Sequence, residues 1–125
     1  MYNIAICDDE IKTLENIATM IKDKFSSMNI EGNYNTCNYP EELLKILDKE
    51  KIDVLFLDID MPKISGMDIG QYILNKSMDT LLIFVTSHDA LVYESFKYHP
   101  FGFIRKSHLE DEIIRWNLNP YRKKL

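Results

Sequence analysis

The sequence is poor in cysteine and has no long apolar run, and each shortage excludes a class of protein. Two cysteines, Cys7 and Cys37, are too few for the disulfide framework of a small secreted domain. No apolar run approaches the roughly 20 residues of a membrane-spanning helix. The N-terminus also lacks the basic and apolar regions of a signal peptide. We therefore expect a cytoplasmic protein with no membrane contact, in which both cysteines behave as small core residues.

Basic charge is also in short supply. Lys and Arg number 15 against 20 Asp and Glu, which gives a net charge of −5. An acidic chain is poorly suited to the phosphate backbone of nucleic acids, so we expect no direct nucleic-acid binding. The length of 125 residues fits one domain. We predict a domain at residues 1–118, followed at 119–125 by a C-terminal tail or the start of a linker.

Short apolar runs alternate with amphipathic segments along the chain. Three apolar runs, at 4–7, 54–57 and 81–85, are too short for a helix and end at polar residues, so they predict strands. Two weaker segments, at 33–38 and 103–105, are also predicted to be strands. Apolar residues spaced three and four apart predict helices at 11–28, from Pro40 onward, and at 66–76, 89–98 and 109–116. A strand followed by a helix, repeated in this way, predicts an α/β fold with a doubly wound parallel sheet of five strands and helices on both faces.

Polar side chains stand where four of the predicted strands end. They are Asp8 and Asp9 after the first strand, Asp58 after the third, Thr86 after the fourth and Lys106 after the fifth. Ligands of open parallel sheets bind beyond these carboxyl ends, so we expect the five side chains to converge. Three neighbouring carboxylates repel one another, and a hard divalent cation such as Mg²⁺ relieves that repulsion. A carboxylate nucleophile beside a metal site, an ammonium and a hydroxyl is typical of phosphoryl transfer.

Each of these residues taken alone has a simpler interpretation. An acid after a strand commonly caps a helix or lies in a solvated turn, a threonine is usually structural, and a lysine is usually a surface charge. Their joint occurrence, each at the end of a predicted strand, favours the functional interpretation.

The segments that carry these residues resemble the receiver domain of two-component response regulators. The matching pieces are IAICDDE (4–10), FLDIDMP (56–62) with Gly66, FVTS (84–87) and FIRK (103–106). The stretch YESFKYHPFGFIRKS (93–107) further resembles receivers coupled to DNA-binding domains of the LytTR type (LytR/AlgR-like). The resemblance implies a flavodoxin-like fold with strand order 2-1-3-4-5.

The resemblance also implies a role for each site residue. Asp58 would accept a phosphoryl group from a histidine kinase, and Thr86 and Lys106 would hold that group. Asp8, Asp9, Asp58 and the backbone carbonyl of Asp60 would bind Mg²⁺, and Phe103 would be the aromatic switch residue.

A receiver of this kind signals through a surface and catalyses only its own phosphorylation and dephosphorylation. Phosphorylation would change the face formed by the fourth helix, the fifth strand and the fifth helix, through which two copies could form a homodimer. The expected output is transcription, controlled by a DNA-binding domain that is absent from this sequence.

Two residues depart from the usual pattern of the family. Ser107 follows Lys106 where most receivers have a proline preceded by a cis peptide bond. Because a cis bond before a non-proline residue costs about 2.5–4 kcal/mol, we predict a trans Lys106–Ser107 bond. Phe103 replaces the more usual tyrosine and has no hydroxyl to donate.

Two other functions stay open on the sequence alone. The segment 58–61, Asp-Ile-Asp-Met, is similar to the DxD nucleophile motif of haloacid-dehalogenase-like phosphatases. In that family the motif precedes the acidic pair, whereas here the pair comes first, and no cap domain is present. A phosphate-independent interaction domain of the same fold is the second alternative. It is disfavoured because buried carboxylates without partners are costly to retain.

Overall fold

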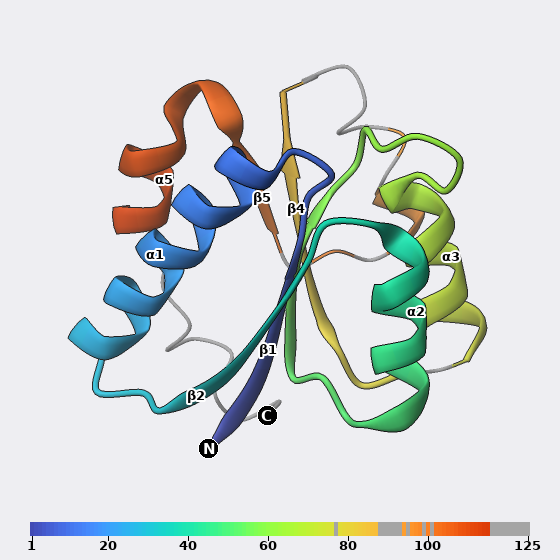
Figure 1. Ribbon diagram of the computed structural model, residues 1–125, viewed down its shortest axis with the longest axis horizontal. Helices are drawn as coiled ribbons and strands as arrows, with labels where there is room; N and C mark the ends of the chain where they lie inside the picture. The colour runs from blue at the N-terminus through green and yellow to red at the C-terminus, as the bar shows by residue number, and fades with distance from the viewer. Residues whose placement is uncertain (77, 88–93, 95, 99, 101, 116–125) are drawn as a thin grey trace.

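The computed structural model describes residues 1–76, 78–87, 94, 96–98, 100 and 102–115 (Figure 1). These residues form a five-stranded parallel sheet with the order β2-β1-β3-β4-β5. The strands are β1 (Tyr2–Cys7), β2 (Gly32–Cys37), β3 (Val54–Asp58), β4 (Leu81–Thr86) and β5 (Gly102–Arg105). The predicted doubly wound α/β fold and the strand order 2-1-3-4-5 are confirmed.

Helices cover both faces of the sheet (Figure 1). On one face lie α1 (Ile11–Ser27) and α5 (Leu109–Arg115), and on the other lie α2 (Pro40–Lys49) and α3 (Gly66–Asn75). Side chains alternate across a strand, so β1 supplies Ile4 and Ile6 to the core under α1, and Ala5 and Cys7 to the core under α2. Strands β3 and β4 are buried along their whole length, as expected for strands covered on both sides.

The structure extends or shortens several of the predicted strands. β1 begins at Tyr2 because it pairs with β2 in register from Tyr2 and Gly32 up to Cys7 and Cys37. β3 and β4 each include one more residue than predicted, so Asp58 and Thr86 are the last residues of their strands. Both side chains are therefore held by the sheet itself.

The predicted helix at 89–98 lies largely outside the described residues. Its described end, Phe96–Tyr98, is a 3₁₀ turn (η1) rather than a continuing α-helix. Pro100 follows shortly after, and a proline cannot donate the backbone hydrogen bond that a longer helix would need. The ring of Tyr98 lies over Gly70 of α3, where an added Cβ would come within 3.2 Å of Tyr98 Cγ. Residue 116, predicted to end the last helix, and the segment 119–125 also lie outside the described residues.

Two further expectations concern the backbone and the membrane. Within the described residues every peptide bond is trans, including the bond between Lys106 and Ser107, as predicted. None of the described helices is both long enough and apolar enough to cross a membrane.

Candidate functional site at the carboxyl edge of the sheet

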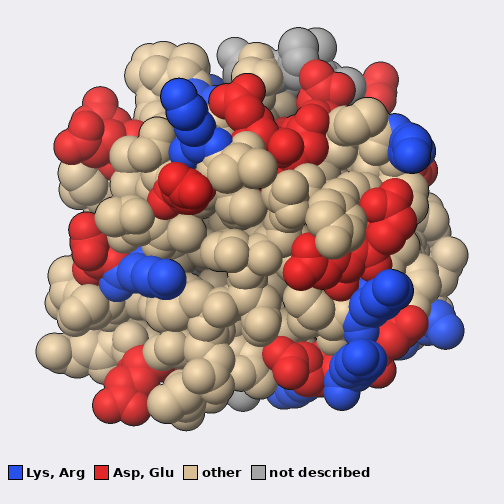
Figure 2. Space-filling view, in the orientation of Figure 1, with Lys and Arg blue, Asp and Glu red and all other residues tan. Residues whose placement is uncertain are grey.

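Three carboxylates meet where β1 and β3 end. Carboxylate oxygens of Asp8, Asp9 and Asp58 all lie within 4.8 Å of one another. They come together because β1 and β3 are neighbours paired in register up to Cys7 and Leu57, so the next residue of each strand emerges at the same edge. Asp8 and Asp58 are 1% and 2% exposed, whereas Asp9 is exposed. Figure 2 shows acidic side chains gathered along the upper edge of the molecule, the end at which these strands finish in Figure 1.

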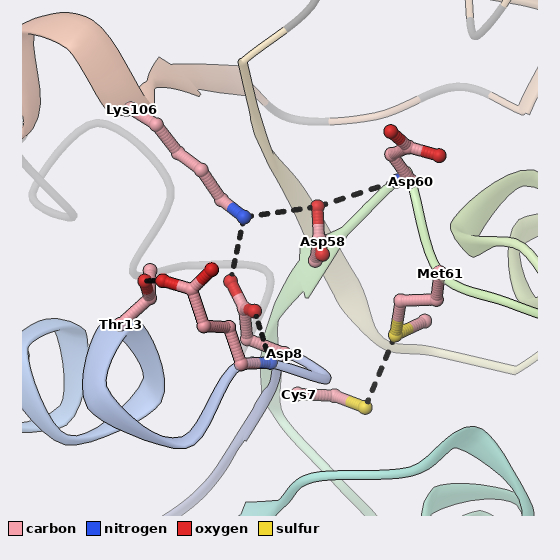
Figure 3. Close-up of polar contacts among 8 residues, drawn as sticks. Cys7, Asp8, Thr13, Asp58, Asp60, Met61 and Lys106 are labelled. Carbon is pink, nitrogen blue, oxygen red and sulfur yellow. Dashed lines mark hydrogen bonds and ion pairs between the residues drawn. The ribbon is translucent and has the colours of Figure 1, made fainter.

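Lys106 reaches into this acidic cluster from the end of β5 (Figure 3). Its Nζ lies 2.8 Å from Oδ2 of Asp8 and 3.3 Å from Oδ1 of Asp58, so one ammonium bridges two carboxylates. Burial disfavours the ammonium, but its hydrogen bond to Asp8 and the charge of Asp58 outweigh burial and raise the pKa of Lys106. The site therefore holds Lys106 as a cation.

Asp58 is ionised at a cost in this environment. Burial and the charge of Asp8 raise its pKa to about 7, although Lys106 and the backbone N–H of Asp60 partly oppose the shift. A carboxyl group whose charge is poorly solvated gains most when additional positive charge comes close. The cluster is thus suited to a cation beyond Lys106.

The backbone orients both buried carboxylates. The N–H of Glu10 donates to Oδ1 of Asp8 at 2.9 Å, and the N–H of Asp60 donates to Oδ1 of Asp58 at 3.2 Å. Each is an aspartate bound to the backbone two residues further on, a common turn for this side chain. The side chain of Asp60 itself is exposed and points away from Asp58 (Figure 3).

The donor set at this edge fits a hard divalent cation. Oδ2 of Asp8 is buried, and the Lys106 ammonium lies 2.8 Å from it. Together with the carboxylates of Asp9 and Asp58, it offers the oxygen ligands that Mg²⁺ prefers. The positions of Asp8, Asp9 and Asp58 thus fit the metal site expected from the sequence.

Gly66 permits the close approach of α3 to the end of β3. Its N–H donates to the carbonyl oxygen of Ile59 at 2.8 Å. An added Cβ would lie 2.4 Å from the carbonyl oxygen of Asp58 and 2.7 Å from Cα of Ile59, closer than backbone atoms can tolerate. The resemblance singled out Gly66 without this reason, which depends on a contact between segments that no local pattern shows.

The start of α3 is also held by a reciprocal cap. The hydroxyl of Ser65 accepts the N–H of Asp68, and the carboxylate of Asp68 accepts the N–H of Ser65. Sequence reasoning missed this cap, although the spacing Ser-x-x-Asp was a usable signal for it. The segment between Asp58 and α3 is therefore anchored at both of its ends.

Thr86 and Phe103 lie on the strands beside the acidic cluster. Thr86 ends β4 one residue beyond Val85, the register partner of Asp58, and it is fully buried. Phe103 is half-buried in β5 and stacks on Phe84 with ring centroids 6.0 Å apart. The Phe96 and Phe103 rings form a T-shaped pair with their centroids 5.5 Å apart. The structure thus places Asp8, Asp9, Asp58, Thr86 and Lys106 at the carboxyl end of the sheet, whereas Phe103 lies within β5 in register with Phe84.

Residues 4–116 match the response regulator receiver domain family. The chain belongs to this family. Receiver domains are signalling phosphoacceptors of two-component systems and not classical enzymes, so the phosphoacceptor role belongs to this receiver as well.

Curated relatives are longer than this receiver. An uncharacterized response regulatory protein of Shewanella oneidensis is 33% identical over 127 aligned residues, which span all of this chain and 50% of the relative. The transcriptional regulatory protein BtsR of Escherichia coli is 32% identical over 85% of this chain and 42% of its own. The receiver therefore spans about half the length of the curated relatives it matches, or less.

Solved structures share its fold. The regulatory domain of MrkE from Klebsiella pneumoniae superposes with a TM-score of 0.78 over 90% of this chain and 88% of that chain, at 24% identity. The response regulator TrrA of Thermotoga maritima, in complex with Mg²⁺ and BeF, has a TM-score of 0.73 at 26% identity, and the match covers the whole of both chains.

Proposed function

We propose that this receiver takes a phosphoryl group from a histidine kinase onto the carboxylate of Asp58. The observation that carries the proposal is the position of Asp58, buried at the end of the central strand β3 between the carboxylate of Asp8 and the ammonium of Lys106. Asp53, which directly precedes β3 at its other end, instead accepts the backbone N–H of Asn3 and pairs with Lys51. Membership of the receiver family supports the same assignment.

The phosphoryl transfer needs no reactant other than the phosphohistidine, Asp58 and water. An oxygen of Asp58 attacks the phosphorus, the phosphorus–nitrogen bond of the phosphohistidine breaks, and the imidazole nitrogen keeps the electron pair and takes up a proton from water. The product is an acyl phosphate on Asp58. Lys106, already 3.3 Å from Oδ1 of Asp58, pairs with the phosphoryl charge, and the Thr86 hydroxyl donates to a phosphoryl oxygen.

Mg²⁺ would be held by the carboxylates of Asp8, Asp9 and Asp58 and by the backbone carbonyl of Asp60. When bound, Mg²⁺ supplies positive charge against the phosphoryl oxygens. The magnesium complex of the related TrrA structure supports this choice of ion.

The phosphorylated receiver would control transcription through its changed surface. Phosphorylation would favour one of two arrangements of the face expected from β5, α5 and the predicted fourth helix at 89–98, most of which lies outside the described residues, with Thr86 and Phe103 as the moving residues. That face could also pair two copies of the receiver. Support comes from the relative BtsR, a transcriptional regulatory protein of which this chain covers 42%. We propose an output of the LytTR-coupled type, with the receiver domain at 1–118 and a C-terminal tail or the start of a linker at 119–125.

Incubation with acetyl phosphate and Mg²⁺, followed by intact-mass measurement, tests the assignment of Asp58. The wild type should gain the mass of one phosphoryl group, and Asp58→Asn should gain none. Asp53→Asn is the matched control, because Asp53 is also an aspartate with little exposure and lies on the segment leading into β3. It should be modified like the wild type. A mass gain in Asp58→Asn equal to that of the wild type contradicts the proposal.

A further inference from the structure

A carboxylate from α5 holds the last residue of β5. Arg105 lies on β5, the edge strand of the sheet, where a backbone donor that points outward has no neighbouring strand. Oε2 of Glu112 accepts the backbone N–H of Arg105, and Oε1 accepts Nε of the same arginine at 2.7 Å. The Glu112 side chain is 23% exposed, compared with 47% for Arg105. One side chain therefore clamps both the main chain and the guanidinium of Arg105.

The clamped residue directly precedes Lys106. On the other side of Lys106 the chain continues as an exposed 3₁₀ turn (η2, Lys106–His108), in which the Ser107 hydroxyl and His108 Nδ1 are 2.8 Å apart. Ser107 and His108 are both exposed, and this contact joins their side chains to each other. On the Arg105 side of Lys106, by contrast, the backbone itself is held by the Glu112 carboxylate.

Helix α5 is itself seated on the core. Ile113, next to Glu112, is 2% exposed and belongs to the apolar cluster beneath α1, against which Leu109 also packs. Glu112 therefore connects a seated helix to the strand end from which Lys106 extends. The ammonium must sit within 2.8 Å of Asp8 and 3.3 Å of Asp58, so a small shift of Arg105 would change both distances.

We propose that Glu112 is a positioning residue for Lys106, acting through Arg105 to hold the ammonium where it meets the phosphoryl group. The inference rests on the proposed function, because it concerns the same acceptor site. A carboxylate suits the role since it offers two acceptor oxygens, one for the N–H and one for the guanidinium. Glutamine keeps one acceptor oxygen, and alanine keeps none.

Titration of the full 125-residue chain with beryllofluoride and Mg²⁺ tests the proposal. Glu112→Gln should weaken the affinity for this phosphoryl mimic by about tenfold, the scale of one lost charge-assisted hydrogen bond. Glu112→Ala should weaken it at least as much. Arg105→Gln, which leaves the backbone bond in place, should have a smaller effect. Glu110→Gln, on an exposed residue of the same helix, is the matched control and should leave the affinity unchanged.

A second background separates positioning from a general loss of structure. In Lys106→Met the ammonium is absent, so Glu112→Gln should no longer change the affinity for the mimic. Thermal unfolding without the mimic records any loss of stability separately. An equal loss of affinity in both backgrounds, or a lowered midpoint with affinity intact, overturns the positioning role. A wild type that neither binds the mimic nor is phosphorylated contradicts the proposed function instead.

Discussion

The segment that forms β3 carries a carboxylate with little exposure at each end, and the two lie in opposite surroundings. Asp53, at the amino end, accepts the backbone N–H of Asn3 at 2.8 Å, and Nζ of Lys51 lies 3.8 Å from its Oδ1. Asp58, at the carboxyl end, faces the like charge of Asp8 as well as Lys106, and its pKa is raised to about 7. Only five positions separate the two aspartates in the sequence.

The neighbours of the two acids, and not their burial, distinguish the structural role of Asp53 from the reactive role that we propose for Asp58. The main chain of Asp53 joins three strands, since its N–H donates to the Asn3 carbonyl at 2.8 Å and its carbonyl accepts the N–H of Leu81 at 2.9 Å. Its side chain completes that junction. Asp58 gains one backbone donor but sits beside a second carboxylate, so its charge is left available for a phosphoryl group or a metal ion.

The largest effect that tests this contrast is expected at Gly66. In Gly66→Ala the new Cβ would press on the carbonyl oxygen of Asp58, and relief of that clash must move the carboxyl end of β3. We expect a loss of about 2–3 kcal/mol in the free energy of unfolding, as for overpacking of a close contact. Urea unfolding measures the loss.

Gly102 provides the matched control for this substitution. Among the described residues no atom lies within 4 Å of a Cβ added there. Gly102→Ala should therefore change the free energy of unfolding much less than Gly66→Ala. Equal losses at the two glycines would show that the close approach at Asp58 does not limit stability.

The two acids should respond in opposite directions when their charge is removed. Asp53→Ala leaves the N–H of Asn3 without its acceptor and should cost about 1–2 kcal/mol of stability. Asp58→Asn removes one of two neighbouring buried charges and should raise the thermal midpoint. Thermal unfolding at pH 7.5 without Mg²⁺ compares them. A lowered midpoint in both variants would contradict the contrast.

Substitution of the two exposed acids near the carboxyl end of β3, Asp9 and Asp60, should affect the affinity for Mg²⁺ differently. Asp9→Ala removes a carboxylate of the cluster, so we expect the affinity for Mg²⁺ to fall by roughly tenfold or more, the least that is seen when metal ligation is disturbed. Asp60→Ala keeps its backbone carbonyl, the proposed ligand, and should bind Mg²⁺ nearly as the wild type does. Isothermal titration measures both, and wild-type affinity in Asp9→Ala would contradict the metal assignment.

The smallest effect is expected for the phenol of Tyr34 on β2, away from both ends of the β3 segment. Burial raises the pKa of Tyr34 above its ordinary value of about 10, so the folded state keeps the phenolic proton more firmly than the unfolded state does. This contribution to stability is fully present below the ordinary pKa of about 10 and is lost as the pH rises through the higher pKa of the folded state. The unfolding midpoint of the wild type should therefore fall more steeply above pH 10 than that of Tyr34→Phe. Parallel curves would contradict the shift.

The strand ends explain why most of the site could be predicted from the sequence. Asp8 and Asp58 each follow a short apolar run, and Lys106 follows the weaker strand segment 103–105; parallel strands bring such positions to one edge regardless of the packing details. The roles of these residues in phosphorylation and metal binding stay predictions. What the resemblance could not supply was the contact of the Lys106 ammonium with Asp8, at 2.8 Å the shorter of its two ion pairs.

Contacts between distant segments account for what sequence reasoning missed. Arg105 and Glu112 are seven residues apart, and they meet only because α5 folds back beside the end of β5. No local pattern predicts the structural role of Asp53, because its partner Asn3 is fifty positions away in the sequence. The predicted helix at 89–98 is wrong at its described end, where Phe96–Tyr98 forms a 3₁₀ turn. Pro100 and the packing of Tyr98 over α3 account for this difference.

The paired cysteines of β1 and β2 make the molecule convenient for spectroscopy. Cys7 and Cys37 are the only cysteines of the chain, and they are 1% and 0% exposed. Burial also raises the pKa of the Cys37 thiol to about 12, so almost no thiolate is present at neutral pH. A maleimide dye should therefore label a cysteine introduced at the exposed Glu94 position while leaving both natural thiols intact. A fluorescent reporter can thus be placed two positions before Phe96 without first replacing a native cysteine.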